Sequence, residues 1–306
     1  MSKQDVKTEH PEQLASGCFS APVDRASPLP VWLRVLEATI GSLNLLGMDA
    51  VLVGLCWQDA AARQWNVPLF VYQQFLLAAA IWLSYIADRA WDVRRYRKIR
   101  PEGLPKRHAF LWRYRNAFSA SFLVIAVTAV CVAIASCGYD EWRNGLSLAG
   151  VAIGYMAFAQ CFPQIGRRVL PREITVAVLF LAGSVLFPCT LKQTPFQAND
   201  TTWLIWGSVL LWANAYGISV WEQKMDEQLD EPTAISQTRY AESRYRWFLR
   251  VIIFIALLRC YLNPSLSSIT LAVALGAILL SIVDRLRKTW IKPALADLSV
   301  LTPWLF

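Results

Sequence analysis

Charged residues are scarce in this chain, and so are residues that bind transition metals. Only 17% of its 306 residues are charged, and two are His. The seven Cys form no CxxC pair, which argues against a zinc or redox motif and favours packing among apolar residues. The first 30 residues contain no apolar segment of the kind found in a signal peptide. These absences leave apolar sequence as the dominant feature.

Hydrophobic residues make up 56% of the chain, and its mean hydropathy is +0.36. Soluble domains carry about 25% charged residues, whereas long apolar stretches indicate membrane spans. The sequence shows no alternation of apolar and polar residues that would favour a β-barrel. The composition therefore predicts a polytopic helical membrane protein with the lipid bilayer as its partner. The net charge of +8 requires no nucleic acid to explain it.

The apolar runs predict an all-α transmembrane bundle of about nine helices. We expect residues 1–30 to be a disordered cytoplasmic tail and residues 31–306 to form the helical domain, with a central cavity opening to the cytoplasmic side. A spanning helix needs about 17–25 residues, so the seventh and ninth runs are short. The nine runs are Leu33–Trp57, Val67–Ala87, Phe118–Ser136, Leu146–Phe162, Ile174–Leu191, Trp203–Trp221, Phe248–Leu262, Ser265–Val283 and Pro293–Phe306.

The positive charges predict how this bundle is oriented. If successive loops lie on alternating sides, all of the 30 Lys and Arg except Arg63, Arg143, Lys192 and Arg259 fall on one side. Because Lys and Arg concentrate in cytoplasmic loops, the amino terminus is predicted to be cytoplasmic. A multi-pass protein of the bacterial inner membrane fits this pattern.

Two acidic clusters lie at the ends of the second and sixth apolar runs. The first contains Asp88 and Asp92, and the second contains Glu222, Asp226 and Asp230. A carboxylate at the centre of a spanning helix costs about 2.5–3.5 kcal/mol, so acids near membrane depth suggest a ligand or a partner. Their spacing of four residues puts each cluster on nearly one helix face. Together the clusters predict a site for Mg²⁺ and a diphosphate on the cytoplasmic side.

At these residues the chain resembles the UbiA superfamily of intramembrane prenyltransferases. That family has nine helices and two aspartate motifs, NDxxDxxxD and DxxxDxxxD, after the second and sixth. Asp88 and Asp92 match the spaced aspartates of the first motif, and Asp226 and Asp230 match the last two of the second. The basic segment 93–101 and the residues after Asp230 also resemble the family's continuations.

The resemblance implies a Mg²⁺-dependent transferase that ionises an allylic isoprenoid diphosphate and transfers the prenyl group to a lipophilic acceptor, for which an aromatic compound is one candidate. Asp88, Asp92, Asp226 and Asp230 would be catalytic and would bind Mg²⁺ together with Glu222. The expected diphosphate-binding residues are basic: Arg95, Arg100, Lys106, Arg168 and Arg172. The expected pocket residues are Ser84, Tyr155, Asn214 and Tyr216.

The chain departs from the family's motifs at three positions. Ser84 stands where the first motif usually has Asn, Tyr85 replaces the Asp beside it, and Glu222 replaces the leading Asp of the second motif. A terpene cyclase of the same superfamily would use the same metal site without an acceptor. The departures also leave open a non-catalytic membrane scaffold or assembly factor. A transporter fits less well, because the acids lie at span ends rather than near the midplane.

Overall fold

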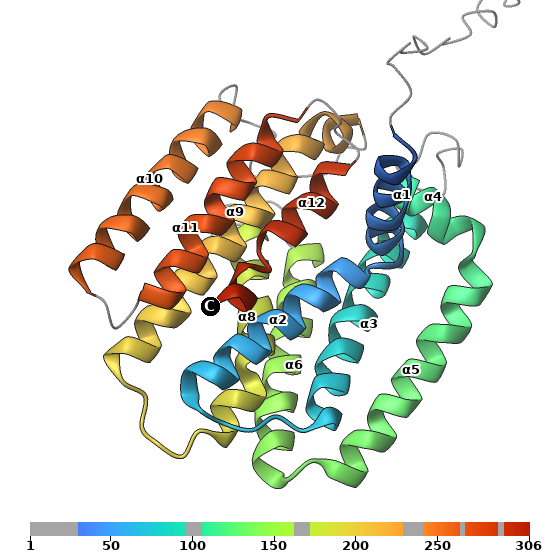
Figure 1. Cartoon of the computed structure of the whole chain (residues 1–306). Helices are drawn as coiled ribbons and strands as arrows, with labels where there is room; N and C mark the ends of the chain where they lie inside the picture. Colours follow the sequence, from blue (N-terminus) through green and yellow to red (C-terminus); the bar gives the residue numbers. More distant parts are fainter. Residues whose placement is uncertain (1–29, 96–105, 162–171, 229–240, 264–266, 287–290) are drawn as a thin grey trace, which may run out of the picture.

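The computed structural model describes residues 30–95, 106–161, 172–228, 241–263, 267–286 and 291–306 (Figure 1). Within these ranges the chain forms eleven α-helices and one short 3₁₀ helix, and contains no β-strand. The helices are α1 (Val31–Leu46), α2 (Met48–Trp65), α3 (Val71–Arg95), α4 (Lys106–Arg113), α5 (Arg115–Ser136), α6 (Tyr139–Cys161), α8 (Arg172–Leu191), α9 (Ala198–Gln228), α10 (Ala241–Leu262), α11 (Ser267–Asp284), α12 (Lys292–Ser299) and the 3₁₀ helix η5 (Thr302–Leu305).

The predicted all-α class is confirmed, whereas the count of nine spans is not. Three described helices are long and apolar enough to cross a membrane: α5, α8 and the part of α9 from Ala198 to Glu222. The bent pair α1–α2 would make a fourth span if its two parts are counted as one. The predicted tail lies almost wholly outside the described residues, which begin at Pro30.

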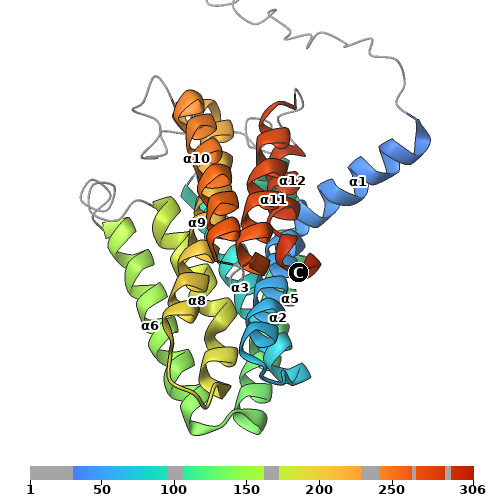
Figure 2. The ribbon, with the colours of Figure 1, turned by 60° about the vertical axis from the view of Figure 1, so that its left-hand side comes forward.

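A sharp break at Gly47 divides the first predicted span into α1 and α2. Gly47 has a φ of 72°, in the left-handed region that glycine adopts without steric penalty. The pair is bent by 82° there, and α1 leans away from the other helices in Figure 2. A Cβ atom at this position would lie 2.5 Å from the ring of Tyr85 on α3. Glycine therefore allows both the turn and the close approach of α3.

The core forms where α2, α8, α9, α10 and α11 pack against one another. Its largest fully buried side chains include Trp57, Leu210, Tyr245, Leu249 and Leu280. On α9, a Cβ atom at Gly207 would lie only 2.8 Å from the ring of Trp57, so glycine lets α2 and α9 approach closely. The helix pair α8–α9 is central, and α8 also contacts α2, α3 and α6.

The outer helix α5 exposes a strongly apolar surface. Only 6% of its most apolar window is buried, and Leu123, Val127 and Ile134 are more than half exposed. Soluble monomers rarely expose contiguous apolar patches of this kind, which mark membrane or protein contacts. The surface of α5 therefore suits contact with lipid acyl chains.

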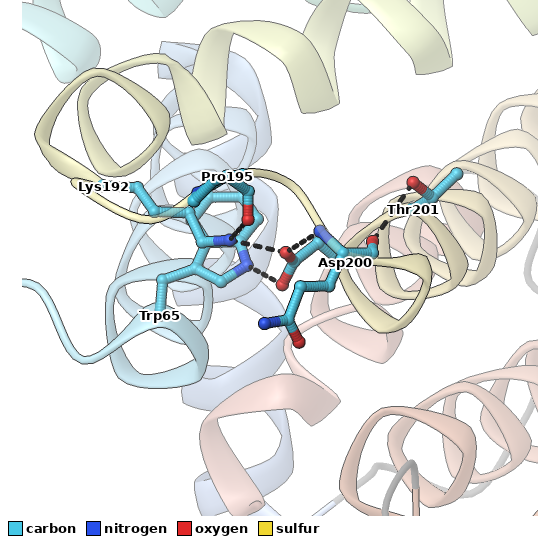
Figure 3. Close-up of polar contacts among 6 residues, drawn as sticks. Trp65, Lys192, Pro195, Asp200 and Thr201 are labelled. Atoms are coloured by element: carbon cyan, nitrogen blue, oxygen red, sulfur yellow. Dashed lines mark hydrogen bonds and ion pairs between the residues drawn. The ribbon is translucent and has the colours of Figure 1, made fainter.

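A dense polar cluster at the N-terminal end of α9 joins this helix to the end of α2 and to the residue after α8 (Figure 3). Asp200 accepts hydrogen bonds from Trp65 Nε1 at 2.8 Å and from the backbone N–H of Gln197 at 2.7 Å. Its carboxylate also pairs with Lys192 Nζ, and both side chains are less than 10% exposed. Every group in this cluster has a partner, which indicates a structural role.

A hollow of about 140 Å³ lies between the end of α2, the start of α11 and the C-terminal residues. Ala60, Trp203, Ile269, Pro303 and Phe306 are among its lining residues. Trp203 lies near the start of α9, whereas Glu222 lies near the other end of that helix. The predicted central cavity is therefore not confirmed by this hollow.

Candidate functional site

The acidic clusters lie near the C-terminal ends of α3 and α9. Helix α3 contains both Asp88 and Asp92, and α9 contains both Glu222 and Asp226. Helix α8 runs antiparallel between α3 and α9 (Figure 1), so its first residues lie at the same end of the bundle. Among the predicted ligands, the structure describes the side chains of Asp88 and Glu222, both of which are partly exposed.

Several predicted site residues fall outside what the structure describes. Helices α3, α4 and α9 include Arg95, Lys106 and Asp226, but their side chains are not among the described ones, and the same holds for Asp92. The residues wholly outside the described ranges are Arg100, Arg168 and Asp230. In the described part of the chain, no three His, Cys, Asp or Glu side chains group together to hold a metal ion. That statement does not cover three of the five predicted Mg²⁺ ligands, because the structure does not describe the side chains of Asp92, Asp226 and Asp230.

An ion pair connects the first acidic cluster to the start of α8. Arg172 Nη2 lies 3.6 Å from Asp88 Oδ2, and both side chains are about half exposed. Tyr155 of α6 lies near both charges, and its hydroxyl is hydrogen-bonded to that of Thr175. Three of the predicted site residues, from α3, α6 and α8, are therefore brought together.

Glu173, the second residue of α8, is buried beside this ion pair. It is 4% exposed, and its Oε1 atom has no hydrogen-bond partner among the described residues. Glu173 lies near Tyr155 of α6 and near Tyr216 of α9. The buried N-terminal turn of a helix stabilises an anion. The sequence does not predict Glu173 as a ligand; its one signal is an acid directly after a basic residue at the start of a span.

The predicted pocket residues have different environments. Tyr216 is half-buried and packs edge-to-face against Tyr245 at 5.7 Å and Phe248 at 6.3 Å. Asn214 is 7% exposed and donates from Nδ2 to Asp297 Oδ1 at 2.7 Å. Ser84 is exposed. Asn214 is therefore part of a buried polar contact, while Tyr216 joins the aromatic packing next to Glu173.

A second polar group lies around the break between α1 and α2. Arg89 of α3 is 4% exposed and donates to the carbonyls of Asn44 and Leu45, each at 2.9 Å, and to the Tyr85 hydroxyl at 2.7 Å. These carbonyls lie in the last turn of α1, where the Asn44 carbonyl also accepts from the Gly47 N–H at 3.1 Å. Arg89 therefore caps the broken helix from the same segment of α3 that carries Asp88.

Two carboxyl groups meet on the other side of this break. Asp49, in the first turn of α2, is 2% exposed and hydrogen-bonded to Asp297 of α12. Removal from bulk water and the adjacent Asp49 carboxyl raise the pKa of Asp297 well above its ordinary value. The sequence patterns did not predict these contacts of Asp49, Arg89 and Asp297. The visible signal was a charged residue inside an apolar run for Asp49 and Asp297, and just after one for Arg89.

Comparison of the chain with family models, with curated proteins and with solved structures finds no match.

Proposed function

We propose that this chain is a membrane-embedded prenyltransferase that acts on an allylic isoprenoid diphosphate. The observation that carries the proposal is the convergence of Asp88, Arg172 and Tyr155 at one end of the bundle, beside the buried carboxylate of Glu173. Acidic and basic groups that are both half exposed at one place are suited to a ligand that carries phosphate and a metal ion. The long apolar helices next to them suit an isoprenoid tail.

The donor set fits a hard divalent cation. Asp88, Asp92, Glu222, Asp226 and Asp230 offer carboxylate oxygens, the ligands that Mg²⁺ takes together with phosphates of a substrate. The buried Glu173 Oε1, which has no partner in the described part of the chain, adds an oxygen near the same end of α8. When bound, Mg²⁺ supplies Lewis-acid stabilisation of the departing diphosphate.

The side chains of this chain have separate roles in the reaction. Arg172 exchanges its contact with Asp88 for one with the diphosphate and stabilises the charge that develops as the bond between C1 and oxygen breaks. The diphosphate leaves with the electron pair, the acceptor bonds to C1, and a proton leaves the acceptor. Tyr155 can orient Arg172 or present its ring face to the allylic cation. The charge pattern favours a cytoplasmic position for this end of the bundle, where soluble diphosphates occur.

The proposal is tested by incubating purified protein with Mg²⁺ and geranyl, farnesyl or geranylgeranyl diphosphate, with and without aromatic acceptors. Pyrophosphate release is the measurement. Asp88→Ala and Asp226→Ala are each expected to reduce release by about 10²-fold or more, and chelation by EDTA is expected to do the same.

Asp140→Ala is the matched control for Asp88→Ala. Asp140 is also an exposed acid paired with an arginine, Arg143 at 3.2 Å. It lies in the first turn of α6, about four turns before the site residue Tyr155 on the same helix. Its substitution should leave release unchanged. Release that requires no acceptor and yields a hydrocarbon or alcohol would assign a cyclase instead. Release that survives both EDTA and Asp226→Ala would rule the metal-dependent mechanism out.

A further inference from the structure

The bend between α1 and α2 is held by side chains of α3. In the last turn of α1, the carbonyls of Asn44 and Leu45 accept from the Arg89 guanidinium, each at 2.9 Å. The Leu46 carbonyl accepts from Trp82 Nε1 at 3.0 Å. In a continuous helix these three carbonyls would accept from N–H groups four residues further along the chain. Because Arg89 is 4% exposed, straightening the bend would take these acceptors away from a buried guanidinium.

The start of α2 is tied to α1 across the same break. Asn44 Nδ2 donates to Asp49 Oδ2 at 2.6 Å, and the N–H of Ala50 donates to Asp49 Oδ1 at 3.0 Å. Gly47, between the two helices, has the positive φ that this turn requires. Contacts on both sides of Gly47 therefore fix the 82° bend between the helices. Helix α1 is not the straight first part of one span.

One face of α1 presents a continuous surface of low polarity. Its members recur at intervals of three and four residues, which aligns them along the helix, and all are exposed: Trp32, Val35, Thr39, Ser42 and Leu46. Trp32 is 66% exposed and Val35 is 59% exposed. The hydroxyls of Thr39 and Ser42 donate to the carbonyls four residues earlier in α1, at 3.0 Å and 2.8 Å. Neither hydroxyl then requires water as an acceptor, which suits a face in contact with lipid.

Helix α1 lies at the level where the apolar helix α5 begins. It contacts α4, which leads directly into α5 (Figure 1). Where α4 meets α5, the Arg115 guanidinium lies 5.2 Å from the ring centroid of Trp112, and the Arg113 guanidinium lies 5.8 Å from that of Tyr114. Basic and aromatic side chains of this kind gather at the boundary between the headgroups and the acyl chains of a bilayer. Because α1 packs against α4, this boundary passes along α1 as well.

We propose that α1 is an interfacial helix that lies along the cytoplasmic surface of the bilayer, with Trp32, Val35 and Leu46 inserted among the lipid acyl chains. A helix bent by 82° from one that crosses the membrane runs nearly in the membrane plane, and Figure 2 shows α1 projecting sideways from the bundle. The sequence of α1 contains one Arg and one Glu, so apolar burial holds it there rather than attraction to anionic headgroups. This role does not depend on the proposed prenyltransferase activity.

The depth of α1 in the bilayer tests the proposal. A dansyl amino acid is incorporated by amber suppression at each of the five exposed positions, and the full chain is reconstituted in phosphatidylcholine vesicles. Its depth is read from quenching by lipids that carry nitroxides at known depths. A straight span would change depth by about 21 Å from residue 32 to residue 46, at about 1.5 Å per residue. With the 82° bend, the change should stay below about 10 Å even if α2 tilts by about 20° from the membrane normal. A larger change would overturn the proposal, and so would the absence of lipid quenching at all five positions.

Two controls and one double variant complete the test. Probes at the exposed residues Leu123 and Ile134 of α5 should differ in depth by about 15 Å, as in a span. Trp32→Asp combined with Val35→Asp puts charge on side chains that the bundle does not bury. Circular dichroism should therefore stay unchanged, while lipid quenching at position 39 should fall at least twofold. Tyr139→Asp, which changes an exposed aromatic residue in the first turn of α6, should leave that quenching unchanged. Unchanged quenching in the folded double variant, or quenching of the wild type only in vesicles with anionic lipid, would contradict the assignment.

Discussion

Removal of the Asp200 carboxylate is predicted to be among the most destabilising single changes in this chain. Asp200 lies in the first turn of α9 and contacts groups from the end of α2 and from the residue after α8 (Figure 3). Lys192 Nζ pairs with its Oδ2 atom, and Trp65 Nε1 donates to its Oδ1 atom at 2.8 Å. The ammonium group of Lys192 also lies 4.9 Å from the ring centroid of Phe196. Asp200→Ala removes the one carboxylate that joins α9 to the end of α2 and to the segment after α8.

The magnitude follows from the burial of the pair. The side chains of Lys192 and Asp200 are 6% and 9% exposed, so the alanine variant leaves an ammonium group in an environment without a counterion. Removal of one partner of a buried pair costs about 3–5 kcal/mol. The hydrogen bonds from Trp65 and Gln197 are lost as well, each worth about 1–3 kcal/mol if its donor stays buried. Because all of these contacts share one carboxylate and water can enter, we expect about 3–5 kcal/mol in total.

The free energy of unfolding is measured in mild detergent by titration with SDS, followed by circular dichroism. Asp59→Ala is the matched control, because Asp59 forms an ion pair with Arg63 at 3.3 Å with both side chains nearly half exposed. Such exposed pairs are worth about 0–1 kcal/mol. The control should therefore unfold at nearly the same SDS fraction as the wild type.

A double variant separates the charge from the hydrogen bonds. Asp200→Asn with Lys192→Met removes both charges and keeps an oxygen that can accept from Trp65 or Gln197. It should recover more than half of the free energy lost in Asp200→Ala. The reasoning fails if Asp200→Ala costs no more than Asp59→Ala, or if the double variant is less stable than Asp200→Ala alone.

Two further predictions concern the orientation of the bundle and the second acidic cluster. A reporter fused after residue 101 should read cytoplasmic and one inserted at Asp140 should read external; a cytoplasmic reading at Asp140 would contradict the orientation taken from the positive charges. In the prenyltransferase assay, Glu222→Asp should keep substantial activity and Glu222→Gln should lose most of it, because the negative charge is what a metal ligand supplies. Equal activity of Glu222→Gln and the wild type across a magnesium titration would remove Glu222 from the site.

Most of the helices were predictable from the hydrophobic runs, although the short α4 coincides with none of the nine runs. Each of the nine apolar runs lies largely within one or two of the described helices, and both acidic clusters begin on helices that extend beyond the predicted runs, α3 with 25 residues and α9 with 31. The break at Gly47 was not predicted, since the apolar run Leu33–Trp57 continues through it. A left-handed glycine inside an apolar run has no signature that separates it from a glycine within a helix. The arginine that caps the break comes from a different segment.

The buried polar contacts were not predictable for a similar reason. Asn214 and Asp297 are 83 residues apart, and their contact depends on how α9 and α12 pack. Local spacing, which led to the acidic clusters, carries no information about such pairs. The sequence predicts Asn214 as a pocket residue because it lies about two helical turns before Glu222. The structure gives it a carboxyl partner that only the tertiary fold could reveal.

The polar groups inside this bundle divide according to whether their hydrogen bonds are complete. Asp284 of α11 accepts from Trp221 Nε1 at 2.9 Å and from Arg246 Nε at 2.7 Å, and Asp200 is bonded on both oxygens. Such groups hold helices together, and their substitution should affect stability first. Glu173 and Asn214 each keep one buried oxygen that has no partner in the described part of the chain. Trp57 Nε1, Gln58 Oε1 and the Tyr245 hydroxyl are likewise buried without a partner among the described residues, so an open atom alone does not mark a binding site. What distinguishes the Glu173 oxygen is its place next to the ion pair of Asp88 and Arg172, so a ligand bound at the proposed diphosphate site could also complete its hydrogen bonding or coordination.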